Sequence, residues 1–177
     1  MASDAAALPR LTLVLGGARS GKSAYAERLV QAAAAPWIYV ATAQAYDDEM
    51  RARIAEHRAR RPAGWETRDA PRDLAGALGA AEPGRPVLVD CLTLWLTNAL
   101  LAEADLAAET GALVDACARH AGPLVLVSNE VGFGIVPDNA LARRFRDEAG
   151  RLHQRLAAIA DRVVLVVAGL PLVVKGE

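Results

Sequence analysis

Residues 16–23 read Gly16-Gly17-Ala18-Arg19-Ser20-Gly21-Lys22-Ser23 and decide the fold class of this chain. They match the pattern G-x-x-x-x-G-K-[ST], the P-loop that binds nucleoside triphosphates. An apolar run (LTLVL, 11–15) comes directly before the loop, and an amphipathic helix is expected directly after it, over residues 22–34. Because this order of strand, loop and helix is the context in which the pattern is informative, a phosphate site is favoured over a plain glycine-rich turn.

The residue types of this loop suit a triphosphate. Glycines let backbone N–H groups surround the phosphate oxygens, and the following helix points the positive end of its dipole at them. Lys22 adds a charge near the β- and γ-phosphates, and the Ser23 hydroxyl is a ligand for Mg²⁺. The candidate nucleotide contacts are Gly16, Gly17, Ala18, Arg19, Ser20, Gly21, Lys22 and Ser23.

Other apolar runs extend the fold outward from the P-loop. Runs with little polar alternation predict strands covered on both faces of a parallel sheet, at 37–41, 86–90, 123–127 and 162–167, with 170–174 as a candidate edge strand. Helices are expected at 22–34, 47–61, 72–80, 92–106, 107–120 and 139–160. This alternation predicts an α/β fold of the P-loop NTPase-like (RecA-like) kind, a mostly parallel sheet with helices on both faces.

The length of the chain limits the number of domains, and its net charge limits the classes of partner that it can bind. With 177 residues, of which 53% are hydrophobic, the chain can form one substantial core but is short for two domains. We expect residues 1–10 to be a flexible N-terminal leader and residues 11–177 to form a single P-loop nucleotide-binding catalytic domain. The 20 Lys and Arg residues nearly balance the 21 Asp and Glu residues, so nucleic acid is a poor candidate partner.

The cysteines and the N-terminal sequence indicate the cellular compartment of the protein. Cys91 and Cys117 are too few and too far apart for a metal cluster, and we expect both to be small buried apolar side chains. The N-terminus lacks the basic region and apolar run of a signal peptide, and no apolar stretch reaches the roughly 20 residues that cross a bilayer. The sequence therefore predicts a cytoplasmic protein without a membrane span.

A carboxylate follows the run at 86–90. P-loop proteins use an acidic residue at the end of a neighbouring strand to hold the Mg²⁺ shell, and Asp90 has that place. An alternative role for Asp90 is to cap the helix that begins near Leu92.

The segment 47–61 predicts a helix with a histidine near its end. Acidic residues at 47–49 and arginines at 58, 60 and 61 match the helix dipole, and Pro62 ends the helix. Met50, Ile54 and His57 share one face. From these residues alone His57 is a general base, a phosphate ligand, a nucleophile or a solvated helix-end histidine.

A long loop is expected from Asn129 to Pro137, after a predicted strand. Ligands bind beyond strand ends in open α/β sheets, so the loop is either part of the site or a structural turn. Within it, Glu130 could serve the metal or a substrate hydroxyl.

Further residues, taken with these, resemble the adenosylcobinamide kinase/adenosylcobinamide-phosphate guanylyltransferase family. In the first half they are Ala41-Thr42-Ala43, Asp48-Glu49-Met50, Arg53-Ile54, His57, Arg61-Pro62 and Trp65. In the second half they are Asp90-Cys91-Leu92-Thr93, Thr97-Asn98, the stretch SNEVGFGIVP at 128–137, Phe145-Arg146-Asp147, Ala149-Gly150 and Gln154. The resemblance spans about residues 11–175, and the 129–137 stretch is far more specific than a P-loop.

This resemblance implies a bifunctional transferase of cobalamin (vitamin B12) biosynthesis with Mg²⁺ as cofactor. Such an enzyme phosphorylates adenosylcobinamide with ATP or GTP and then transfers GMP from GTP to adenosylcobinamide phosphate, releasing pyrophosphate. In the family the transfer passes through a GMP-histidine intermediate, and the matching residue here is His57, whereas His120 and His153 do not match. The implied partners are GTP, ATP, adenosylcobinamide and adenosylcobinamide phosphate, and the implied assembly is a homotrimer.

The resemblance also places nucleotide contacts outside the P-loop. They fall on Thr42, Ala43, Gln44, Arg58, Ala59, Arg60, Arg61, Asp69 and Asp90. The family has glutamate at the positions that match Asp69 and Asp90, so this chain has shorter carboxylates there. The expected catalytic residues are His57 and Lys22, with Ser23 and Asp90 on the metal side.

Two other functions fit a P-loop. A monofunctional small-molecule kinase would move only the γ-phosphate and use His57 structurally, and labelling the protein with α-labelled GTP separates it from a guanylyltransferase. A nucleotide-switched binding module would show nucleotide-controlled binding to another protein without turnover of adenosylcobinamide. Such a switch has no evident need for a histidine beside an arginine cluster.

Overall fold

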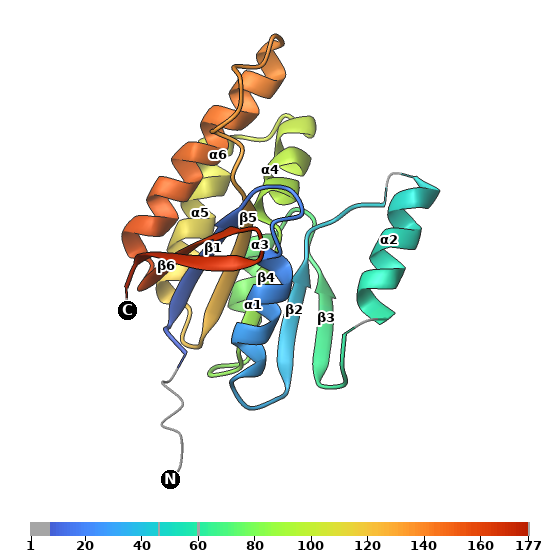
Figure 1. Cartoon of the computed structure of the whole chain (residues 1–177), viewed down its shortest axis with the longest axis vertical. Coiled ribbons are helices and arrows are strands. Elements are labelled where there is room, and N and C mark those ends of the chain that lie inside the picture. Colours follow the sequence, from blue (N-terminus) through green and yellow to red (C-terminus); the bar gives the residue numbers. More distant parts are fainter. Residues whose placement is uncertain (1–7, 46, 60, 177) are drawn as a thin grey trace.

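Seven strands of the described residues form one sheet in the computed structural model of the chain (Figure 1). The structure describes residues 8–45, 47–59 and 61–176, without the side chains of Glu49, Met50, Arg53 and His57. The strands are β1 (Leu11–Gly16), β2 (Trp37–Ala41), β3 (Trp65–Asp69), β4 (Val87–Asp90), β5 (Leu124–Asn129), β6 (Arg162–Val167) and β7 (Leu170–Lys175). Their order is β3-β2-β4-β5-β1-β6-β7, and only β7 runs antiparallel to its neighbour.

The helices found in the described residues agree in number and place with those predicted. They are α1 (Lys22–Gln31), α2 (Asp48–Ala59), α3 (Leu74–Gly79), α4 (Leu92–Leu101), α5 (Leu106–Arg119) and α6 (Ala140–Ile159). The end of α4 was predicted too late. The chain leaves the helix near Glu103, whose φ of 54° lies outside the right-handed helical region.

Alternate side chains of the strands enter two separate cores, one on each face of the sheet. Leu11, Leu13 and Leu126 are among the strand residues that pack against α3, α4, α5 and α6. Val14 and Val125 belong to the other core, which α1 covers. The strands are buried on both faces for this reason, which confirms the predicted parallel sheet with helices on both sides.

The strand β3 (WETRD) was not predicted from the sequence. It lies at one edge of the sheet beside β2, and its residues are only half-buried or exposed, in contrast to the fully buried central strands. An edge strand with polar residues lacks the apolar run by which the others were recognised. Its discovery matters for function because it carries Asp69 at its end.

Helix α2 stands apart from the sheet, beyond β2 and β3 (Figure 1). Its described side chains are exposed except for that of Ile54, which is half-buried. None of the helices in the described part of the chain is long and apolar enough to cross a membrane.

The expected leader falls mostly on residues 1–7, outside the described residues. Its last residues are in contact with the fold. Leu8 packs against the core on the α1 side, and Arg10 donates hydrogen bonds to the carbonyl oxygens of Cys117 and Ile159.

Candidate active site

The carboxyl ends of five neighbouring parallel strands meet at one edge of the sheet. Ala41 at the end of β2 pairs in register with Asp69 on one side and Asp90 on the other. Gly16 at the end of β1 pairs with Asn129 at the end of β5. Since ligands of open α/β sheets bind beyond this edge, the register alone brings predicted site residues of β1, β3 and β4 together.

The P-loop turns from β1 into α1 with its backbone held from two sides. The N–H of Glu130 donates to the carbonyl oxygen of Gly16, and the N–H of Gly169 donates to that of Ser20. Helix α1 begins after Gly21, which has a left-handed φ of 91° and, as glycine, no side chain to cap the helix. The first N–H groups of α1 are therefore available to an anion, as a phosphate site requires.

Lys22 is almost fully buried in the loop that it serves. Its exposed fraction is 8%, and its Nζ donates to the carbonyl oxygen of Gly17 at 3.1 Å. This bond holds the ammonium group against the P-loop backbone, where the motif predicts that phosphates bind.

A cavity of about 770 Å³ opens at this edge of the sheet. It is lined from one side by Lys22 and Ser23 and from the other by residues of α2. The complete lining is Lys22, Ser23, Tyr39, Ala41, Ala43, Ala45, Arg51, Ile54, Ala55, Arg58, Arg61, Asp69, Asp90, Cys91, Leu94 and Asn129. A cavity of this size holds a small-molecule ligand, and its position identifies it as the candidate active site.

The Asp90 carboxylate lies in the wall of this cavity and accepts a hydrogen bond from the Tyr39 hydroxyl at 2.8 Å. Helix α4 begins after Cys91 and has no side-chain cap there. The cap that the sequence allowed for Asp90 is therefore replaced by the bond to Tyr39. The peptide between Asp90 and Cys91 is cis.

One face of α2 is turned to the cavity. Arg51, Ile54, Ala55 and Arg58 follow the spacing i, i+3, i+4, i+7 and all line it. Arg58 forms an exposed ion pair with Asp69, which ties α2 to the end of β3. His57 lies in the same helix, but its side chain is outside the described part of the structure.

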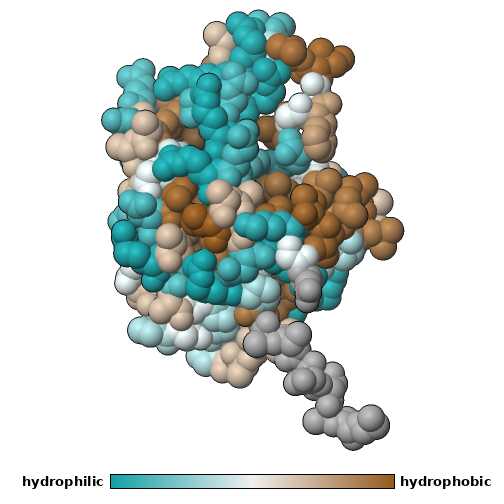
Figure 2. All heavy atoms as spheres, turned by 90° about the vertical axis from the view of Figure 1, so that its left-hand side faces the viewer, coloured by the Kyte–Doolittle hydropathy of each residue, from teal (hydrophilic) through white to brown (hydrophobic). Residues whose placement is uncertain are grey.

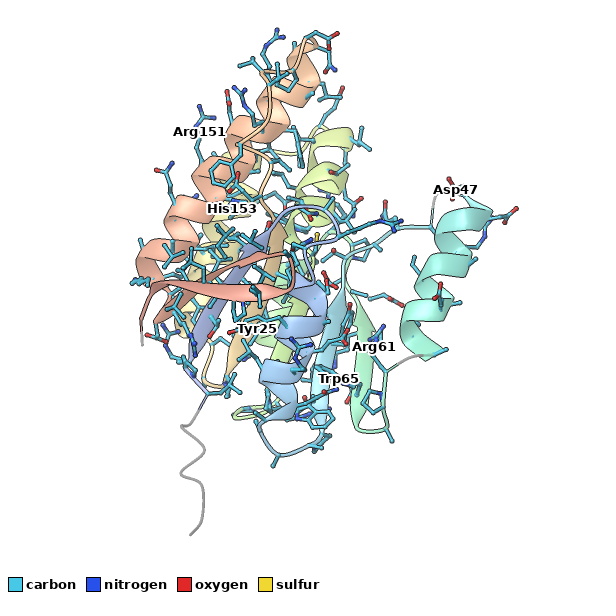
Figure 3. All side chains as sticks on the ribbon, in the orientation of Figure 1. Tyr25, Asp47, Arg61, Trp65, Arg151 and His153 are labelled. Carbon is cyan, nitrogen blue, oxygen red and sulfur yellow. The ribbon has the colours of Figure 1, made fainter. Side chains whose placement is uncertain are left out.

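Arg61 follows α2 and lies against the sheet near Trp65 (Figure 3). Its guanidinium carbon stands 3.5 Å from the centre of the Tyr39 ring, and its Nη1 donates to the Thr67 hydroxyl at 2.9 Å. The arginine is thus held in the cavity wall by stacking and by a hydrogen bond.

Several predicted nucleotide contacts do not line the cavity. Those in the P-loop are Gly16, Gly17, Ala18, Arg19, Ser20 and Gly21. Thr42 is fully buried, and its hydroxyl donates to the Cys91 carbonyl oxygen and accepts from the Cys91 N–H. The side chain of Thr42 therefore joins β2 to β4. Gln44 and Ala59 are not in the cavity lining, and Arg60 lies outside the described residues.

Glu130 lies next to the P-loop but not in the cavity lining. Its Oε1 accepts the N–H of Gly132, and its Oε2 is 4.0 Å from Nδ1 of the buried His153. The other ring nitrogen of His153, Nε2, is 2.8 Å from the Ser128 hydroxyl. Burial lowers the pKa of His153, against the opposing effect of Glu130. The hydrogen bond from Gly132 holds the Glu130 carboxylate at the start of the 129–137 loop.

Nine residues of the lining were not among the predicted site residues, and they are Tyr39, Ala41, Ala45, Arg51, Ile54, Ala55, Cys91, Leu94 and Asn129. Asn129 could have been found, because it ends a predicted strand and strand ends meet at the site. Tyr39 could not, because it falls within an apolar run that only indicates burial. Both cysteines are buried, as predicted, and both are free.

Comparison with known proteins gives a family. Residues 12–174 match the family model described as cobinamide kinase / cobinamide phosphate guanyltransferase. The chain is 55% identical over 168 residues to the bifunctional adenosylcobalamin biosynthesis protein CobP of Pseudomonas aeruginosa, covering 93% of this chain and 97% of that protein. It is 46% identical over 181 residues to the bifunctional adenosylcobalamin biosynthesis protein CobU of Salmonella typhimurium, covering 93% and 99%.

Solved structures bear on the fold alone. An ATPase from the type III secretion system of pathogenic bacteria matches with a TM-score of 0.54 at 12% identity, covering 89% of this chain and 51% of that chain. The RecA-like P-loop fold predicted from the sequence is confirmed.

Proposed function

The chain belongs to the cobinamide kinase / cobinamide phosphate guanyltransferase family, and from this premise we propose how its residues carry the chemistry. It is a bifunctional transferase of cobalamin biosynthesis that phosphorylates adenosylcobinamide and then transfers GMP from GTP to adenosylcobinamide phosphate. The observation that carries the assignment of residues is the shared cavity, which has Lys22 and Ser23 at the end of the P-loop on one side and the helix of His57 on the other.

In the kinase reaction a hydroxyl of adenosylcobinamide attacks the γ-phosphorus of ATP or GTP, the bond from that phosphorus to the β,γ-bridging oxygen breaks, and the nucleoside diphosphate and the hydroxyl proton are released. The P-loop N–H groups and the buried Lys22 hold the triphosphate and stabilise the charge that develops on the leaving diphosphate. Binding in this position orients the γ-phosphate towards the open side of the cavity, where the second substrate arrives.

In the guanylyltransferase reaction the imidazole of His57 attacks the α-phosphorus of GTP. The bond from that phosphorus to the bridging oxygen breaks, pyrophosphate leaves, and a GMP-histidine intermediate forms. The phosphate of adenosylcobinamide phosphate then attacks the same phosphorus, which gives adenosylcobinamide-GDP and restores the histidine. Splitting the transfer avoids bringing two highly charged phosphate groups together in one step.

We infer that helix α2 moves in this reaction. Successive helical residues are turned by about 100°, so position 57 lies beside the face that Ile54 and Arg58 present to the cavity. The attachment of α2 through an exposed ion pair, Arg58 with Asp69, allows a swing or rotation of the helix when GTP binds. Arg58 and Arg61 then contact the phosphates, as does Arg60 beside them.

The residues present fit a magnesium ion. The Ser23 hydroxyl and the Asp90 carboxylate line the same cavity and are hard oxygen donors. No cluster of three or more His, Cys, Asp or Glu residues that could hold a metal occurs in the described residues. Mg²⁺ at triphosphate sites is commonly bound by one or two carboxylates together with the substrate phosphates. Bound there, Mg²⁺ neutralises charge on the phosphates.

The homotrimer and the cytoplasmic location also stay proposals. Exposed apolar residues on the β6–β7 hairpin, among them Leu170, Leu172 and Val174, give this chain a surface suited to association (Figure 2). Family resemblance is the reason for three copies, and the nucleoside triphosphate substrates are the reason for the cytoplasm.

Labelling with GTP tests the nucleotidyl step. Incubation with GTP labelled at the α-phosphorus is expected to label the native protein, with a bond stable in alkali and labile in acid. His57→Asn is expected to abolish the label and the GMP transfer while adenosylcobinamide phosphorylation continues.

The matched control is His120→Asn. His120 lies between α5 and β5, near the amino ends of the strands, whereas the cavity lies at their carboxyl ends. This variant should therefore label like the native protein. Absence of label in the native protein, or full label in His57→Asn, would contradict the proposed intermediate.

A further inference from the structure

Tyr39 connects two charged groups of the cavity. It lies in β2 with an exposed fraction of 5% and forms part of the cavity wall. Its hydroxyl donates to Oδ2 of Asp90 at 2.8 Å, and its ring carries the Arg61 guanidinium at 3.5 Å. One side chain therefore contacts both a carboxylate expected on the metal side and an arginine expected on the phosphate side.

The hydroxyl of Tyr39 is a hydrogen-bond donor to Asp90. A phenol has an ordinary pKa of about 10, so at neutral pH it keeps the proton that it donates to Oδ2 of Asp90 at 2.8 Å. A hydrogen bond to one oxygen of a carboxylate fixes the direction of the whole group.

The ring of Tyr39 is itself held in place. Trp65 meets it edge-on with ring centres 5.8 Å apart, and Trp37 packs against Trp65 at 5.3 Å. Arg61 lies on the Tyr39 ring and is also bonded to Thr67. A planar cation stacked on a fixed ring keeps its donors in one plane, which suits recognition of phosphate oxygens.

We propose that Tyr39 is a positioning residue of the nucleotide site, which orients Asp90 towards the cation that accompanies the triphosphate and presents Arg61 to the phosphates. The inference rests on the proposed roles of Asp90 and Arg61. The two contributions use different parts of the side chain, because the hydroxyl serves Asp90 and the ring serves Arg61. Substitutions can therefore separate them.

Tyr39→Phe removes only the contact with Asp90. Calorimetric titration with GTP at a series of Mg²⁺ concentrations is expected to show that the Mg²⁺ concentration for half-maximal affinity rises about tenfold, the effect of losing one hydrogen bond to a charged group. The GTP affinity at saturating Mg²⁺ should change less than about twofold, because the ring and Arg61 remain.

Tyr25→Phe is the matched control. Tyr25 lies on α1, packs partly buried against the same core as Tyr39 and is not in the cavity lining. This variant makes the same chemical change and should leave the Mg²⁺ dependence as it is in the native protein. Circular dichroism checks that each variant is folded.

Tyr39→Leu removes the ring as well. It should lower the GTP affinity even at saturating Mg²⁺, by about threefold to tenfold. In a Tyr39→Leu, Arg61→Met double variant this affinity loss should be no larger than in Arg61→Met alone, because the ring acts through the arginine.

A double-mutant cycle with Asp90→Asn decides whether the hydroxyl acts through Asp90. Adding Tyr39→Phe to Asp90→Asn should cause little further shift in Mg²⁺ dependence. A normal Mg²⁺ dependence in Tyr39→Phe, or fully additive shifts, overturns the role of the hydroxyl while the proposed function stands. A normal Mg²⁺ dependence in Asp90→Asn itself overturns both the metal role of Asp90 and this inference.

Discussion

Gly16 and Gly17 of the P-loop differ in the space that a side chain would have at each position. A Cβ on Gly16 would come within 2.8 Å of the Val166 carbonyl oxygen and would also meet the Ser20 hydroxyl. The serine can rotate away, but the carbonyl belongs to the neighbouring strand β6 and cannot. At Gly17 a Cβ would meet nothing within 4 Å. The first glycine is needed for packing, and the second leaves the backbone open to phosphate.

Gly16→Ala should therefore be much more harmful than Gly17→Ala. We expect Gly16→Ala to lower the free energy of unfolding by about 1–3 kcal/mol through overpacking, and to weaken GTP binding because the loop shifts. Gly17→Ala should stay within about 0.5 kcal/mol of the native protein. Urea unfolding of both variants is the measurement, and equal losses of stability would contradict the difference in their surroundings.

Single residues also mark where sequence reasoning stops. Lys22, Ser23, Asp69 and Asp90 were predicted as site residues, and all four line the cavity. Thr42 stays a predicted nucleotide contact, and its hydroxyl is bonded to the backbone of Cys91. A short polar residue beside a strand end fits both roles, and only the geometry of the neighbouring strand distinguishes them.

At the scale of elements, apolar runs located every central strand, because burial on both faces demands them. The edge strand β3 was not predicted, because it pairs with β2 on one side only and its polar sequence contains no apolar run. The position of α2 away from the sheet could not be predicted from the sequence either. Its dipole-matched charges predict a helix wherever it packs.

The β6–β7 hairpin is the element expected to hold chains together. Leu172 lies on β7 with an exposed fraction of 59%. Leu172→Lys should place a charge in the buried contact and raise the concentration at which the proposed trimer dissociates by at least about tenfold. Light scattering across a dilution series measures this.

Leu101→Lys is the control, because Leu101 at the end of α4 has the same exposed fraction of 59% but is not part of the hairpin. A native chain that is monomeric at all concentrations contradicts the trimer. A Leu172→Lys variant as stable in assembly as the native chain contradicts the place of the hairpin in it.

At the scale of the whole molecule, two buried histidines make stability depend on pH. Burial lowers the pKa values of His120 and His153 below the ordinary histidine value. At pH values between the lowered pKa of the folded state and the ordinary pKa of the unfolded state, the unfolded chain binds more protons than the folded chain. The free energy of unfolding therefore has its full value above the ordinary pKa and decreases as the pH falls below it.

Urea unfolding should therefore give a lower free energy at pH about 5.5 than at pH about 7.5, on either side of the ordinary histidine pKa. His153→Gln should reduce this difference, since glutamine carries no titrating proton. Gln154→Ala, at the exposed neighbouring position on α6, should keep it. A pH difference that is unchanged in His153→Gln would show that the histidine titrates normally.

The P-loop is the first motif of the chain, but its shape depends on the last hairpin. Strand β1 lies between β5 and β6, and the N–H of Gly169 in the β6–β7 turn donates to Ser20 within the loop. When a ribosome has synthesised only the first half of this sequence, the P-loop has emerged, but β5 and β6, the strands that flank β1, have not yet been made. Nucleotide binding is therefore expected to begin only after residues 162–175 have left the exit tunnel and β6 has paired with β1.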